Sequence, residues 1–170
     1  MKTRIIMTCV LCALLGSCMT TIGANDKVSK KQKEMQEELR NEPLMNFYSM
    51  NVNAFALHRQ EIILKRTDNG GVLTVARGFE EEDSQKVQKV EVADSILDHV
   101  RNLIVDGLLF DLKDSYYPEF DITDATSWSL DFKLGTKKFG SSGYAVGPDH
   151  AETLREIEQY LCTLYEERTR

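Results

Sequence analysis

The segment Ser127-Trp128-Ser129-Leu130-Asp131-Phe132-Lys133 decides the fold class more than any other part of the chain. Large apolar and polar residues alternate strictly along it, and a β-strand places alternate side chains on opposite faces of its sheet. The pattern predicts a strand that buries its three large apolar side chains on one face. Residues 134–136 contain a glycine and predict a turn into a partner strand that runs from residue 137 towards residue 142.

Three or four further strands are expected before this hairpin. Residues 48–54 alternate between apolar and polar, with Tyr48, Met50, Val52 and Ala54 on the apolar side, which predicts a half-buried strand. The β-prone runs 61–66 and 72–77 flank Asp68-Asn69-Gly70-Gly71, and an Asn-Gly pair between such runs favours a hairpin. A short fourth strand is expected within residues 86–92.

Two amphipathic helices are predicted. The first covers residues 95–106, where apolar residues recur at helical spacing; Asp94 or Ser95 suits its N-cap, and Gly107 suits its C-terminal turn. The second follows Asp149, which forms a capping-box pattern with Glu152. The expected inner face of this last helix consists of Ala151, Leu154, Ile157, Leu161, Leu164 and Tyr165.

The resulting order is β-β-β-(β)-α-β-β-α. Because the strands cluster and do not alternate with helices, the sequence predicts an α+β fold rather than a doubly wound one. We expect an antiparallel sheet of about five or six strands, with two helices packed on one face. This single globular domain is expected to occupy residues 44–170.

Composition excludes several classes of protein. The chain has 170 residues, of which 42% are hydrophobic and 28% are charged, so it is neither disordered nor a multi-span membrane protein. Its formal net charge of −6 argues against nucleic-acid binding, which needs clustered Lys and Arg.

The amino terminus has the pattern of an export signal. Lys2 and Arg4 precede an apolar run that is too short to cross a bilayer as a helix. This run ends in Leu15-Gly16-Ser17-Cys18, which resembles the lipobox of bacterial lipoproteins. The resemblance implies that residues 1–17 are removed and that Cys18 is lipidated, so that acyl chains anchor the protein to a membrane.

The segment 18–43 is expected to connect this anchor to the domain. It is mostly polar and charged, with too few large apolar residues to pack a helix onto a core, so a solvated helical spacer ending before Pro43 is predicted. A partner-binding coiled segment is the alternative interpretation. Of the four cysteines, Cys9 and Cys12 leave with the signal and Cys18 carries lipid. Cys162 then has no disulfide partner and is expected to be a buried apolar residue.

The last third of the chain resembles an uncharacterised domain found in small lipoproteins of the Bacteroidota type. The resemblance is carried by Asp124, the segment 127–130, Gly135, Ser142-Gly143 and Pro148 before the terminal helix. It implies an α+β domain and transfers no activity. Ala145 departs from the pattern, in which Asn is frequent at that position.

Met19 is not the Asp that retains some lipoproteins at the inner membrane, and no acidic cluster follows Cys18. We therefore expect an outer-membrane lipoprotein that faces the periplasm.

Signatures of catalysis are missing from the sequence. His58, His99 and His150 form no metal-binding motif, and Gly140-Ser141-Ser142-Gly143 is one residue shorter than a nucleophile elbow. No cofactor or metal is therefore predicted, and enzymatic activity stays open with a preference against it. Asp121 and Asp124 are candidate carboxylates for the alternative function, a hydrolase of cell-wall or dietary glycans.

The preferred function is a non-catalytic binding or structural module that presents a surface to an envelope protein or a glycan. Aromatic side chains on a loop supply contact area at little entropic cost, and the chain has such a cluster before its central strand. The same aromatics could instead close the end of the core. The candidate ligand or partner surface consists of Tyr116, Tyr117, Pro118, Ser141, Ser142 and Gly143.

Overall fold

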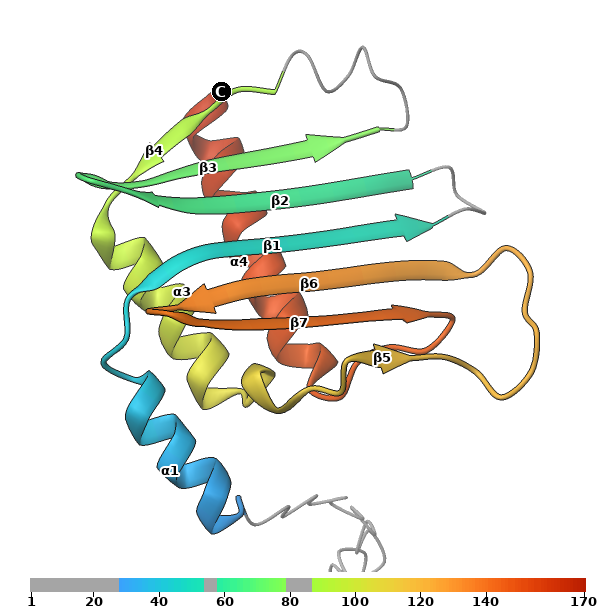
Figure 1. Ribbon diagram of the computed structural model, residues 1–170. Helices are drawn as coiled ribbons and strands as arrows, with labels where there is room; N and C mark the ends of the chain where they lie inside the picture. The colour runs from blue at the N-terminus through green and yellow to red at the C-terminus, as the bar shows by residue number, and fades with distance from the viewer. Residues whose placement is uncertain (1–27, 54–57, 79–86) are drawn as a thin grey trace, which may run out of the picture.

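The computed structural model describes residues 28–53, 58–78 and 87–170 (Figure 1). The predicted signal segment 1–17 and the predicted lipid attachment site Cys18 lie outside the described residues, so both stay predictions. The same holds for Ala54 at the end of the first alternating run.

The fold is α+β, as expected. Its sheet has seven strands in the described part of the chain, in the spatial order β4-β3-β2-β1-β6-β7-β5. The strands are β1 (Leu44–Asn53), β2 (His58–Thr67), β3 (Gly70–Arg77), β4 (Val90–Val92), β5 (Ser115–Tyr116), β6 (Thr126–Leu134) and β7 (Lys137–Tyr144).

The expectation of five or six antiparallel strands is corrected by β5. This strand pairs in parallel with β7 through Ser115–Ser142 and Tyr116–Gly143, so the sheet is mixed. With only two residues, β5 is too short to produce an alternating pattern, and its pairing depends on contacts far away in sequence. The two predicted hairpins, β2–β3 and β6–β7, are both present.

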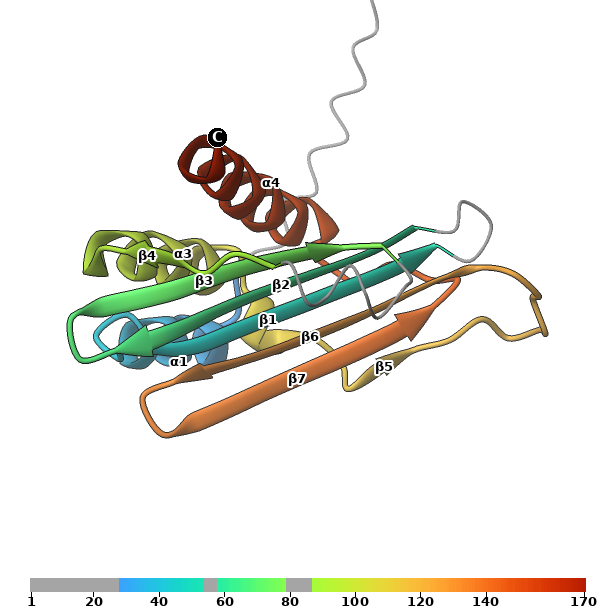
Figure 2. The same cartoon turned by 90° about the horizontal axis from the view of Figure 1, so that it is seen from above.

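The helix packing differs from the prediction of two helices on one face, because the described part of the chain has three α-helices. α3 (Asp94–Asp106) and α4 (Ala151–Thr169) lie behind the strands in Figure 1, and Figure 2 shows them on the same side of the sheet. A 3₁₀ turn, η1 (Leu109–Asp111), follows α3. None of the described helices is long and apolar enough to span a membrane.

Both predicted N-caps are wrong. Ala93 occupies the N-cap of α3 and makes no side-chain cap bond, and His150 takes the same position in α4 with a φ of 58°. Asp149 is used elsewhere, because its carboxylate accepts a hydrogen bond from the Tyr116 hydroxyl at 2.9 Å. A tertiary contact has therefore replaced the local capping box.

The alternation of residues 48–54 predicts that Tyr48 and Met50 are buried, but the structure covers the opposite face of β1. Phe47 and Ser49 are buried against the helices, while Tyr48 and Met50 lie partly exposed on the other face. The register decides this, because Phe47 pairs with Phe132 and Ser49 pairs with Leu130, and paired residues share a face. The central strand 126–134 thus fixes the orientation of its neighbour.

The described residues before Pro43, 28–42, belong to the folded body. The helix α1 (Lys30–Leu39) begins with a capping box between Ser29 and Gln32, which confirms a helix in this segment. The prediction that it is fully solvated is wrong, since Leu39 is 0% exposed and belongs to the hydrophobic core. One buried leucine at the end of a polar helix was not anticipated from its composition.

Candidate functional site

A cavity of about 460 Å³ lies between the first half of α4 and one end of the sheet, and its volume is within the range of small-ligand sites. It is bounded by the β1–β6 end of the sheet, by α4 and by the segments that follow β5 and β7. The residues that line this cavity, which we name the Trp128 cavity, are Asn51, Ile122, Ala125, Thr126, Trp128, Ala145, Val146, Gly147, Pro148, Ala151, Leu154, Arg155 and Glu158.

Trp128 provides the apolar floor. It is held in place by a hydrogen bond of 2.7 Å from its Nε1 to the carbonyl oxygen of Val146 and by a tilted ring contact with Tyr116 at 5.6 Å between centroids. On the neighbouring strand Gly143 makes room for the indole, because a Cβ there would lie 2.3 Å from Trp128 Nε1. The glycine is thus required by packing at this point.

Glu158 is the carboxylate of the cavity. Its Oε1 accepts hydrogen bonds from the Ser49 hydroxyl and, at 2.7 Å, from Asn51 Nδ2. Burial raises the pKa of Glu158 above its ordinary value, against the opposing influence of these two donors and of Arg155. The alternation of β1 therefore places two polar side chains on the covered face to receive one acidic side chain from α4.

The rim of the cavity has unusual backbone geometry. Asp124, Ala145 and His150 have φ values of 59°, 60° and 58°, a region that residues other than glycine seldom occupy. Ala145 lines the cavity itself, and Asp124 and His150 each precede a residue that lines it. Such conformations cost free energy and concentrate at functional sites, where the surrounding structure enforces them. The backbone N–H of Ala145 is fixed by a hydrogen bond of 2.9 Å to the Thr126 carbonyl.

A second cavity of about 390 Å³ continues on the other side of Glu158. The two cavities share Arg155 and Glu158. Here Arg77 forms an ion pair of 2.9 Å with Glu166, next to the buried thiol of Cys162. Burial raises the pKa of the Cys162 thiol, which agrees with the predicted role as a buried, unreactive residue.

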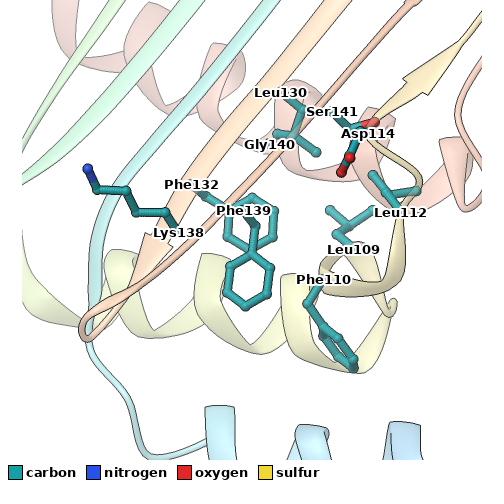
Figure 3. A pocket seen from close by; sticks show the side chains of 10 residues that line it. All are labelled: Leu109, Phe110, Leu112, Asp114, Leu130, Phe132, Lys138, Phe139, Gly140 and Ser141. Atoms are coloured by element: carbon teal, nitrogen blue, oxygen red, sulfur yellow. The ribbon is translucent and has the colours of Figure 1, made fainter.

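A third, smaller cavity of about 160 Å³ lies at the β7 edge (Figure 3). Side chains from η1 and from β6 and β7 converge on it, and Phe132 and Phe139 stack there with centroids 5.0 Å apart. Ser141, one of the predicted surface residues, lines this cavity, and its hydroxyl donates to the Lys113 carbonyl at 2.6 Å.

The predicted partner residues are brought together by the β5–β7 pairing, but they do not form one exposed surface. Tyr116, Ser141 and Gly143 are buried, and Tyr116 closes the core, as the alternative interpretation of the aromatic cluster proposed. Tyr117 is 65% exposed. Pro118 and Ser142 are partly buried, and the Ser142 N–H bonds to the Asp114 carbonyl. The aromatic cluster before β6 also contains Phe120, which is 71% exposed and is the second exposed ring beside Tyr117.

Asp121 and Asp124 are both exposed, and neither lines any of the three cavities. Within the described ranges, no three His, Cys, Asp or Glu side chains are grouped as metal ligands.

Sequence reasoning missed Glu158, Ser49 and Asn51. A signal for Glu158 was present, because it lies four residues after Leu154 and four before Cys162, within the apolar stripe of α4. An acidic residue inside such a stripe must find hydrogen-bond donors on the surface that the helix covers.

No family model matches the chain, and a search of curated proteins gives no similar protein.

Proposed function

We propose that the protein is a lipid-anchored envelope lipoprotein whose domain is a binding module, with the Trp128 cavity as its ligand site. The proposal of a lipid anchor rests on Leu15-Gly16-Ser17-Cys18, and the proposed location is the outer membrane, facing the periplasm. Two or more acyl chains on Cys18 would hold the acidic chain firmly, since its surface charge does not favour anionic headgroups.

The observation that carries the binding function is the composition of the Trp128 cavity. It combines an apolar floor with a small number of polar groups at one side, which is the usual arrangement of a small-molecule site. The indole of Trp128 and the carboxylate of Glu158 are both held by hydrogen bonds before any ligand arrives. A preorganised site of this kind loses little conformational entropy on binding.

The geometry does not favour glycoside hydrolysis. That reaction needs two carboxyl groups on opposite sides of the scissile bond. Among the described residues, one carboxylate lines the Trp128 cavity, and the candidate pair Asp121 and Asp124 is outside it. The non-catalytic module is therefore the proposed function.

The anchor is tested by Cys18→Ser. The variant should appear in the soluble fraction of lysed cells, whereas the wild-type protein sediments with membranes and dissolves in detergent. Equal sedimentation of the two proteins would contradict lipidation.

The cavity is tested by photocrosslinking in the native envelope. A benzoylphenylalanine placed at Val146, on the rim of the cavity, should add the mass of a small molecule to the protein after irradiation. The same probe at Thr136, in the β6–β7 turn at the other end of the sheet, is the control. Identical mass spectra for the two positions would contradict a ligand site at the cavity.

A further inference from the structure

Two opposite charges meet at the mouth of the Trp128 cavity. Arg155 and Glu158 are three residues apart on α4, so their side chains leave the helix on the same side, roughly 5–6 Å apart at their Cβ atoms. Both line the cavity. They do not form an ion pair within 4 Å, and Arg155 has no carboxylate at that distance anywhere in the described part of the chain.

Each charge keeps capacity for a ligand. Both internal donors of Glu158 bond to Oε1, and among the described residues none donates to Oε2. Arg155 is exposed, with its five N–H donors available. A cationic group at Oε2 would meet a partly buried carboxylate, and charge-assisted hydrogen bonds are stronger there than in open water.

Apart from the two charged residues and the polar Asn51 and Thr126, the side chains that line the cavity are apolar. Trp128, Leu154 and Val146 contribute side chains to it, with small alanines on the rim. A volume of about 460 Å³ leaves room for a large side chain in addition to a charged head group.

We propose that the Trp128 cavity binds a free α-amino acid with a large apolar side chain, with the amino group at Glu158, the carboxylate at Arg155 and the side chain against Trp128. This inference rests on the proposed function and specifies its ligand. An amino acid carries its two opposite charges on one carbon, which matches two charges one helical turn apart. A simple amine or a simple acid would leave one of the two protein charges without its partner.

The test uses three probes that share a phenyl ring: L-phenylalanine, phenethylamine and 3-phenylpropionate. Trp128 is the only tryptophan of the chain, so its fluorescence reports occupancy of the cavity directly. The full mature protein in detergent should bind L-phenylalanine at least about tenfold more tightly than either singly charged probe, because one charge-assisted hydrogen bond contributes that much.

Variants then assign each charge. Glu158→Gln should lower the affinity for L-phenylalanine and phenethylamine by about tenfold or more and leave 3-phenylpropionate unchanged. Arg155→Gln should weaken L-phenylalanine and 3-phenylpropionate and leave phenethylamine unchanged. Glu156→Gln, an exposed acid on the same helix that does not line the cavity, is the matched control and should bind as the wild type does.

Two results would overturn the inference. One is equal affinity of the three probes, which would show apolar binding without recognition of the charges. The other is no fluorescence change with L-phenylalanine or L-leucine in a wild-type protein that circular dichroism shows to be folded. If the Val146 crosslink nevertheless captures a small molecule, the ligand assignment fails while the proposed function stands. If neither the fluorescence change nor the crosslink is observed, both the ligand assignment and the proposed binding function are contradicted.

Discussion

Replacement of Leu39 by alanine should destabilise the whole domain, although Leu39 precedes the segment in which the sequence places the domain. Leu39 is 0% exposed, and α1 is also tied to the body by hydrogen bonds from Gln36 to the Val105 carbonyl at 3.0 Å and from Gln32 to Asp111 at 2.6 Å. An ion pair of 2.8 Å joins Arg40 to Asp106 in addition. The helix is therefore expected to unfold together with the sheet.

The magnitude follows from the burial of the side chain. Leu39→Ala removes the equivalent of three methylene groups, each contributing about 0.8 kcal/mol when fully buried, or about 2.4 kcal/mol together. A residual cavity adds to this loss, so the free energy of unfolding should fall by about 2–4 kcal/mol. With a urea m-value of about 2 kcal/mol/M, the unfolding midpoint should decrease by about 1–2 M.

The assay is urea unfolding of residues 28–170, followed by the fluorescence of Trp128 in the sheet and by circular dichroism. Glu37→Ala, an exposed position on the same helix, is the control and should change the free energy of unfolding by less than about 0.5 kcal/mol. If Leu39→Ala has an effect as small as that of Glu37→Ala, α1 is a solvated spacer and the argument from its burial is refuted.

Three further predictions concern the cavities. Gly143→Ala should displace the indole of Trp128, shifting its fluorescence to longer wavelength and lowering the melting temperature, whereas Gly147→Ala, where an added Cβ meets nothing within 4 Å, should change neither. Because burial raises the pKa of Glu158 in the folded state, this group favours folding at acid pH, and its contribution is lost as the pH rises from about 4.5 through the raised pKa. Urea titrations across this range should therefore show Glu158→Gln gaining stability relative to the wild type as the pH rises; a constant difference would contradict a raised pKa. Cys162 should react with maleimide much more slowly in the native protein than in urea, and equal rates would show that its thiol is accessible.

Local patterns determined most of the secondary structure. The alternation of residues 127–133, the Asn-Gly signal at residue 69 and the apolar stripe of α3 each specify an element from interactions within a few residues. Their order alone predicted the α+β fold class, because a sheet and amphipathic helices must bury their apolar faces against each other.

Tertiary structure decided which side of β1 is buried and where the Trp128 cavity lies. Tyr48 and Met50 of β1 point to the partly exposed face, since cross-strand pairing with β6 places Phe47 and Ser49 on the covered face. This choice brings Ser49 and Asn51 under Glu158, a side chain more than 100 positions away in sequence. No local pattern contains such a pairing, because the free energy that holds a buried carboxylate comes from donors that only the folded sheet supplies.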